Sequence, residues 1–467
     1  MKKFLISISF TCSIMWVQAQ DSSRLSLSFE EYMSIVQQYH PIAKQADIQI
    51  EKAKAALLSA RGMFDPLLET QTSQKSFDGI RYYNSVDPSL TIPTWYGIEL
   101  YAGTGYLSGT RVDPTETLGE ISYAGISVPL ARNLLMDKRR AALKTGAIYR
   151  DLSVVERRTI VNDLLLDAAA AYWSWVRDYE VLQVVNKAVL VNEDRMRFIR
   201  SATNIGERAV IDKVEALAQL QQFRFLQNQS NVQFANAAIE LSLFLWQQNS
   251  IPYNLSTNVS PTKNLLDAAG KEAGDPVLAD LLQSASLNHP KLTSFDFKLR
   301  ALEVDRRLKF QELLPYVQLK YNQLGKGYNV MKTATAFLSD NNYKFGIGFS
   351  MPLRLSEGRA AYRTAKLKIT ETAIQQDYTR IQIMNKVKQI FNEQINIKNQ
   401  ITLQEQMYLN YLRLQRAEET RFANGESSLF LINTRENKAI ESLQKLVELR
   451  SKYFEIRAKL QNAVGVF

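Results

Sequence analysis

Few residues in this sequence are suited to chemistry. It contains two histidines, His40 and His289, and one cysteine, Cys12. A metal or catalytic site needs several clustered His, Cys or carboxylate groups, and no such cluster accompanies either histidine. Both histidines directly precede a proline, Pro41 or Pro290, where the start of a helix explains them. We therefore expect no catalytic residue, no metal site, no cofactor and no enzyme.

The carboxylates and the charge balance suggest no other reaction. The pairs Glu30-Glu31 and Glu418-Glu419 are interpreted as solvated helix faces. A Walker-type phosphate loop is absent from the sequence, so the chain itself is not expected to be an ATPase. The formal net charge of +10 could suit nucleic acid. A solvated basic surface is favoured, because the N-terminus predicts export.

The N-terminus has the pattern of a secretory signal peptide. Met1-Lys2-Lys3 is followed by an apolar run over 4–17 and by Ala19, after which we expect cleavage, so residues 1–19 are assigned to the signal. The apolar run is shorter than the roughly 20 residues of a spanning helix. Cys12 lies inside it, so the mature chain is expected to contain no disulfide. No later apolar stretch approaches spanning length, which leaves a soluble, surface-bound or β-barrel protein.

The positions of the two histidines belong to an internal repeat. Each His-Pro pair is followed by an amphipathic stretch, over 42–61 and 291–313. A second proline, Pro66 or Pro315, follows 26 residues after the histidine in both copies. Two further features recur: an Arg-Ala-Ala triplet and, 66 residues after its arginine, a glycine. They are Arg140-Ala141-Ala142 with Gly206, and Arg359-Ala360-Ala361 with Gly425. Equal spacing in both copies indicates duplication of a rigid unit.

Each 66-residue interval predicts one long helix. Val154, Val161, Leu165, Ala168, Tyr172 and Val176 form a narrow apolar seam of coiled-coil type. At 1.5 Å per residue such a helix is about 100 Å long. After each glycine a second helical pattern returns, over 209–245 and 429–463. This arrangement predicts two antiparallel helical hairpins, each with a glycine at its tip.

Five other segments predict strands. They are aromatic-rich and bounded by turns, and cover 66–73, 95–106, 123–128, 316–321 and 343–351. Alternation of apolar with small or charged residues is clear over 343–349, as in strands of outer-membrane barrels, although a soluble hairpin stays open for each segment alone. Two hairpins give about four strands, a closed barrel needs at least about eight, and open edges do not persist in lipid. Several chains would therefore share one barrel.

The repeated pattern resembles the TolC-like outer-membrane factors across essentially the whole mature chain. The resemblance rests on the His-Pro helices, the Gly-Ile-Ser-Val-Pro-Leu strand ending at 125–130, the Arg-Ala-Ala triplets and the glycine tips. It implies a mainly α fold with β structure, in which long helical hairpins form a periplasmic α-barrel and the strands form a twelve-stranded membrane β-barrel shared by a homotrimer. The corresponding division is repeat 1 (20–248), an equatorial linker (249–275) and repeat 2 (276–467).

The resemblance also implies a function. The trimer would be the passive exit duct, in the outer membrane, of a tripartite efflux or type I secretion system. Its partners would be a periplasmic adaptor (membrane fusion protein), an inner-membrane transporter and outer-membrane lipid, and not nucleic acid. The alternative is a periplasmic coiled-coil adaptor or scaffold without a pore. Duplicated hairpins with strands at the opposite end favour the channel.

The sequence departs from the family in its first hairpin, which carries about 30 extra residues within 80–118. An enlarged extracellular loop, a plug and an additional β-structure all fit this segment. The sequence does not distinguish them.

The tips are the predicted adaptor-docking sites. They comprise Asn204, Ile205, Gly206 and Glu207 in the first hairpin, and Asn424, Gly425 and Glu426 in the second. The alternative is that the glycines only make turns.

The resemblance also locates a periplasmic constriction. The family has carboxylates at the sixth and ninth residues after the second tip glycine, where this chain has Leu431 and Thr434. The corresponding first-hairpin residues are Asp212 and Glu215, which share a helix face. They either form a ring of six acidic side chains with an apolar Leu431 ring, or pair with Arg208, Lys213 or a neighbouring helix.

Overall fold

The computed structural model describes residues 26–256, 258–262, 265 and 276–467. The predicted signal peptide with Cys12, and residues 266–275 of the predicted linker, lie outside the described residues.

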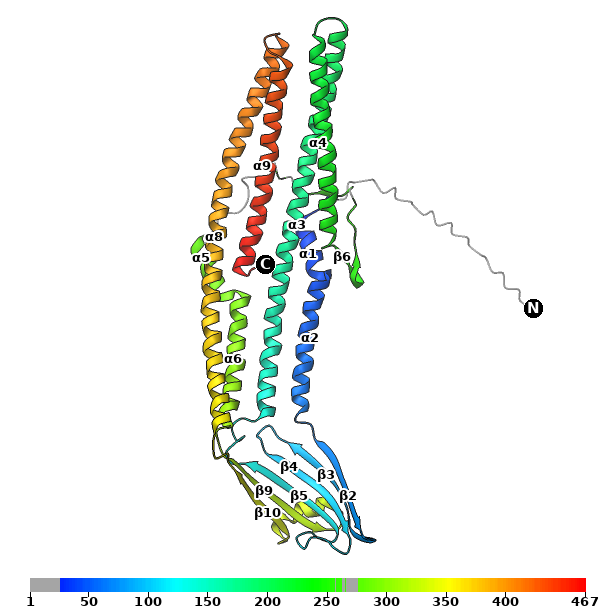
Figure 1. Cartoon of the computed structure of the whole chain (residues 1–467), viewed down its shortest axis with the longest axis vertical. Coiled ribbons are helices and arrows are strands. Elements are labelled where there is room, and N and C mark those ends of the chain that lie inside the picture. Colours follow the sequence, from blue (N-terminus) through cyan, green and yellow to red (C-terminus); the bar gives the residue numbers. More distant parts are fainter. Residues whose placement is uncertain (1–25, 257, 263–264, 266–275) are drawn as a thin grey trace, which may run out of the picture.

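The molecule is a long rod of helices with a sheet at one end and two tight turns at the other (Figure 1). The first half of the chain contains α1 (Phe29–Tyr39), α2 (Pro41–Gly62), β2 (Leu67–Phe77), β3 (Ile80–Pro93), β4 (Glu99–Ser108), β5 (Gly119–Pro129), α3 (Lys138–Asn204) and α4 (Val210–Ser242). The second half contains α5 (Leu278–Asn288), α6 (Pro290–Gln311), β9 (Tyr316–Lys326), α7 (Val330–Thr335), β10 (Tyr343–Ser350), α8 (Ser356–Ala423) and α9 (Leu429–Val464). Two-residue strands β1 (Ser26–Leu27) and β8 (Ser260–Pro261) pair in parallel, and β6 (Trp246–Gln247) pairs with β7 (Ile251–Pro252).

Helices of matching length occur in the same order in both halves. α1 and α5 each have 11 residues, α2 and α6 each have 22, and α3 and α8 have 67 and 68. The predicted long helices and returning helices are confirmed. α5 was not predicted, and of α1 only Glu30-Glu31 was interpreted as part of a helix face.

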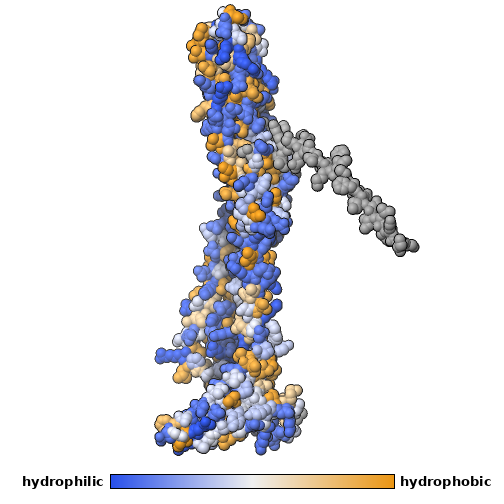
Figure 2. Space-filling view, turned by 90° about the vertical axis from the view of Figure 1, so that its right-hand side faces the viewer, coloured by the Kyte–Doolittle hydropathy of each residue, from blue (hydrophilic) through white to orange (hydrophobic). Residues whose placement is uncertain are grey.

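Each long helix packs against two shorter ones. α3 contacts α2 in its sheet-side part and α4 in its tip-side part, while α8 contacts α6 and α9 in the same way (Figure 1). The predicted seam of α3 is buried from Val161 to Val176, but Val154 is 46% exposed. Hydrophobic residues also lie at the surface of the rod among hydrophilic ones (Figure 2).

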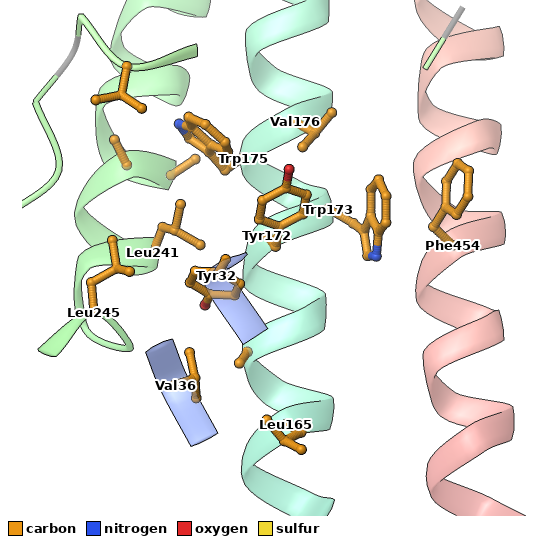
Figure 3. Packing of buried hydrophobic residues seen from close by; sticks show 14 of the residues in the cluster. Tyr32, Val36, Leu165, Tyr172, Trp173, Trp175, Val176, Leu241, Leu245 and Phe454 are labelled. Atoms are coloured by element: carbon orange, nitrogen blue, oxygen red, sulfur yellow. The ribbon is translucent and has the colours of Figure 1, made fainter. Parts of the chain in front are cut away.

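The largest core cluster lies midway along the rod, where α1, α3, α4 and α9 meet (Figure 3). Trp173 of α3 stacks on Phe454 of α9 with ring centroids 4.2 Å apart, which joins the two halves of the chain. On another side of α3, Tyr172 packs against Tyr32 of α1, and its hydroxyl donates to the Leu27 carbonyl at 3.0 Å. Buried aromatic side chains contribute heavily to core packing, and such packing supplies most of the stability of helices in proteins.

The six longer strands form one antiparallel sheet, in the order β10-β9-β5-β4-β3-β2. The β5–β9 pair joins the two halves of the chain. The prediction of about four strands is therefore wrong, because the extra segment of the first half folds as β-structure within this sheet. All five predicted strand segments are observed, and β3 is the strand that was missed.

A turn signal in the sequence could have located β3. Asp78 and Gly79 take positive φ values of 52° and 72°, as the Asp-Gly turn of a β-hairpin requires. Pro88 obscured the strand, because proline has no N–H to donate within a sheet. The β3–β4 pairing accordingly skips from Val86 to Ser89.

Within the described residues, no helix is both long enough and apolar enough to cross a membrane.

Candidate functional site

The two His-Pro junctions are structural. His40 Nδ1 accepts a hydrogen bond from the Ile42 N–H (3.2 Å), and His289 Nδ1 accepts one from the Lys291 N–H (3.1 Å). Each histidine therefore caps the helix that its proline begins, which confirms the predicted explanation of these residues. In the described part of the chain, no group of three or more His, Cys, Asp or Glu side chains could hold a metal ion.

Burial keeps both imidazoles neutral near pH 7. Burial lowers the pKa of His289 to about 4, and the Lys291 and Lys386 ammonium groups act in the same direction, while Asp163 opposes them. The pKa of His40 is also lowered by burial. Neutrality matters because the capping Nδ1 must keep a free lone pair.

The first tip is an exposed turn that follows α3. Asn204, Ile205, Gly206 and Glu207 are all exposed, Ile205 to 71%. The Glu207 N–H donates to the Ala202 carbonyl (2.9 Å), across Gly206 at a φ of 83°. This hydrogen bond ends the helix in the way that favours glycine.

The second tip repeats this geometry after α8. Asn424, Gly425 and Glu426 are exposed, and the Glu426 N–H donates to the Arg421 carbonyl (2.8 Å), across Gly425 at a φ of 81°. An added Cβ would meet nothing within 4 Å at either glycine. Both tips lie together at the end of the rod opposite the sheet (Figure 1).

The predicted constriction residues lie in the first two turns of α4 and α9. Asp212 and Glu215 are half-buried, and Glu215 accepts a hydrogen bond from the Asn433 amide of α9 (3.3 Å). Burial raises the pKa of Glu215, and so does the charge of Asp212, whereas the Asn433 hydrogen bond lowers it. Leu431 and Thr434 of α9 are exposed, and the Thr434 hydroxyl donates to the Phe430 carbonyl at 2.8 Å.

Arg208, suggested as a cationic partner of Asp212 and Glu215, contacts Phe422. Its guanidinium lies 4.0 Å from the centre of the Phe422 ring of α8, and its Nη2 donates to the Phe422 carbonyl at 3.4 Å. Glu215 thus contacts a neighbouring helix through an amide.

Sequence reasoning missed a polar network that joins the two hairpins near these tips. Arg195 of α3 forms an ion pair with Glu436 of α9 at 2.6 Å, and the Glu436 side chain is only 3% exposed. Asn192 donates to the same carboxylate (3.2 Å), and Gln219 of α4 donates to Asn437 of α9 (2.7 Å). A signal was present in α9, where polar residues recur at helical spacing on a face that is otherwise apolar.

Glu418 corrects another prediction. Its side chain is 9% exposed rather than solvated, and it accepts a hydrogen bond from the Ser427 hydroxyl at 2.5 Å. Arg421 and Arg435 lie 3.8 and 4.0 Å away. Glu418 therefore lies on the side of α8 that faces the returning helix α9, and contacts residues of the tip and of α9.

At the other end of the rod, the two faces of the sheet differ in polarity. The register from β3 to β10 defines which residues share a face. One face carries polar and small residues, among them Asp87, Ser89, Tyr101, Gly103, Tyr123, Ser127, Lys320, Asn322 and Lys344. The opposite face carries mainly apolar residues, among them Leu90, Ile92, Leu100, Ile126, Val128, Leu319, Phe345, Ile347 and Phe349. α7 covers the distal part of the apolar face, where Thr333 contacts Ser122 at 2.8 Å.

Comparison with known proteins relates this geometry to one class. The family model described as outer membrane efflux protein matches residues 281–466. The probable efflux pump outer membrane protein SepC of Pseudomonas putida is 25% identical over 191 residues, which make up 41% of this chain and 38% of SepC. The aligned part is thus well under half of either protein.

Solved structures extend the likeness in fold to nearly the whole chain. The Campylobacter jejuni CmeC outer membrane channel superimposes with a TM-score of 0.63 at 14% identity, covering 94% of this chain and 86% of CmeC. The outer membrane protein VceC of Vibrio cholerae superimposes with a TM-score of 0.63 at 14% identity, covering 93% of this chain and 95% of VceC. The fold is that of the outer-membrane channels. The predicted resemblance to the TolC-like outer-membrane factors is confirmed at the level of the fold.

Proposed function

We propose that this chain forms the outer-membrane exit duct of a tripartite efflux or type I secretion system. In this proposal the chain is one third of a homotrimer, with the sheet in the outer membrane and the helical rod in the periplasm. A periplasmic adaptor and an inner-membrane transporter would deliver the cargo and supply the energy. Residues 20–248 and 276–467 would be two structural repeats joined by the equatorial linker 249–275.

One observation carries this proposal: the sheet has a polar face and an apolar face but is open at both edges. Among the described strands, β2 pairs only with β3 and β10 pairs only with β9. Open edges carry unpaired N–H and C=O groups, which are not tolerated in lipid. Closure with neighbouring copies satisfies them and encloses the polar face as a lumen.

The helical rod supports the same assembly. On α8, Leu367, Ile374 and Ile381 are spaced seven residues apart and are 60%, 65% and 59% exposed. A heptad-spaced apolar seam without a partner in its own chain is typical of a coiled-coil interface. A neighbouring subunit would cover it.

Fractionation and cross-linking test this proposal. We expect the protein to sediment with outer membranes, to require detergent for extraction, and to run as a heat-labile oligomer that cross-links into trimers. Recovery in the soluble periplasm, or monomers alone after cross-linking in detergent, would refute the duct and favour a coiled-coil scaffold.

The entrance of the duct would lie at the tips. We assign adaptor docking to Asn204, Ile205, Gly206 and Glu207, and to Asn424, Gly425 and Glu426. Their exposure at the end of the rod supports this assignment.

The same end of the rod would hold the constriction. Asp212 and Glu215 would supply six carboxylates per trimer, and the exposed Leu431 and Thr434 would supply an adjoining ring of lower charge. Asp212 and Glu215 lie three residues apart on one helix face. Burial raises the pKa of Glu215, and the nearby charge of Asp212 adds to this effect, which supports an acidic cluster that favours cations.

A further inference from the structure

The extra segment of the first half adds a complete hairpin to the sheet. β3 and β4 contain 14 and 10 residues, and about 9–11 residues suffice for a tilted strand to span a bilayer. β3 lies between β2 and β4, and β4 lies between β3 and β5. If this hairpin were a loop or a plug outside the wall, β2 would lose its described partner β3, and β5 would keep only β9.

The turn between β3 and β4 is held at the helical end of the sheet. Trp95 in this turn stacks on Phe64, just after α2, with ring centroids 4.7 Å apart and an interplanar angle of 7°. Glu99, at the start of β4, forms an ion pair with Arg139 of α3 at 2.6 Å. β3 therefore returns all the way from the distal turn to the helices, and β4 starts again from there.

The polar face of the β3–β4 hairpin is continuous with the polar face of the neighbouring strand β5. The Tyr123 hydroxyl of β5 donates to the Asp87 carboxylate of β3 at 2.9 Å. The Tyr123 ring crosses β4 above Gly103, where an added Cβ would lie 2.6 Å from the ring. Glycine at this position thus allows one polar lining to run across three strands.

We infer that three copies of this chain close an eighteen-stranded barrel, six strands from each, in which β2 of one copy pairs antiparallel with β10 of the next. This inference rests on the proposed trimeric duct and replaces the twelve strands that the resemblance implied. At a strand spacing near 4.8 Å and a tilt near 40°, the barrel is about 36 Å across, whereas twelve strands give about 24 Å. Barrels of 16–18 strands leave a water-filled lumen. The outer-membrane end of the duct is therefore wide, and the selective narrowing belongs to the helical end.

The decisive measurement is the width of the assembled trimer. The mature chain is expected to lack cysteine, so a nitroxide on Ile126→Cys, at the outer face of β5, reports only the distances between its three symmetry copies. Eighteen strands place these backbone positions about 31 Å apart, and twelve place them about 21 Å apart. Pulsed electron paramagnetic resonance in lipid nanodiscs should give the longer distance, extended by the label. The shorter one would overturn the inference.

Accessibility on β3 provides an independent check. A label on Leu90→Cys should collide with oxygen dissolved in the lipid, and a label on Ser89→Cys with a water-soluble relaxing agent. Ile126→Cys and Ser127→Cys on β5 are the matched controls. Water access at both β3 positions, with normal alternation on β5, would overturn the eighteen-stranded wall and leave the duct intact. Water access at Ile126→Cys as well would overturn both.

Discussion

At the scale of single residues, the two histidines show how a chemically versatile side chain can serve backbone geometry alone. Each lies in extended conformation between two helices, with φ near −65°, and accepts a hydrogen bond from the N–H of the second residue of the following helix. Gly465, which caps the C-terminal end of α9, lies against the second junction, where an added Cβ would be 2.6 Å from Pro290 Cδ. The junction thus also positions the end of α9.

His289 should make stability depend on pH. Its folded pKa of about 4 lies below the ordinary value of 6.5, so the unfolded chain binds more protons between these two values. Its contribution to stability is complete above pH 6.5 and is lost as the pH falls toward 4. We expect the unfolding temperature of the wild type in detergent to fall more steeply between pH 7 and 4.5 than that of His289→Asn, which keeps a capping oxygen. Parallel profiles would contradict this assignment.

The acidic residues near the entrance should control ion preference. Asp212→Asn with Glu215→Gln removes six negative charges from a trimer without changing side-chain size. We expect cation preference in single-channel recordings to decrease, and half-blocking concentrations of divalent cations to rise roughly tenfold, about 1.4 kcal/mol of lost binding. Lys213→Gln is a control for a general change in charge.

Unchanged selectivity and block in the carboxylate variant would show that these side chains do not line the pore. A larger resting conductance would instead indicate that Glu215 and Asn433 hold neighbouring helices together.

At the scale of elements, the helices carry two kinds of apolar seam. On α8, Ile383, Val387, Ile390 and Ile397 are buried within the chain, whereas Leu367, Ile374 and Ile381 are exposed. The first seam holds the chain together, and the second is available to another subunit.

Charging the exposed seam should therefore weaken assembly and leave the chain folded. Burying an isoleucine contributes about 1.5–3 kcal/mol, so Ile374→Glu with Ile381→Glu should lower the temperature at which trimers dissociate on heated gels by more than about 10 °C. The matched pair Ile374→Leu with Ile381→Leu should behave nearly as the wild type. Trimers of the glutamate variant that resist heating like the wild type would exclude α8 from the interface.

At the scale of the whole molecule, the two tips lie at one end of the rod and the sheet lies at the other (Figure 1). Gly206→Trp with Gly425→Trp adds bulk and backbone strain at positive φ only to the exposed end. We expect export to fall at least tenfold while trimers remain in the outer membrane, as measured by cargo efflux and heat-labile oligomers on gels. The control variant, Asn204→Ala with Asn424→Ala, changes exposed tip residues without adding the bulk of tryptophan. Normal export by the tryptophan variant would show that the glycines serve only to make turns.

Much of this architecture is determined by local sequence. The His-Pro pairs, the glycine tips and the long apolar seams located the helices, because helix ends and helix faces depend on residues only three to seven positions apart. The strands around Tyr123 and Tyr343 followed from alternation for the same reason. The structural likeness to outer-membrane channels agrees with what those local patterns predicted.

Only the tertiary structure decided the contacts between distant segments. The place of β3 in the sheet depends on pairing with β2 and β4, and Pro88 hid it from local patterns. The burial of Glu418 and the pairing of Arg195 with Glu436 depend on which helix faces meet, and Arg195 and Glu436 lie 241 positions apart in the chain. Such contacts arise from packing across the rod, and spacing along the chain does not specify them.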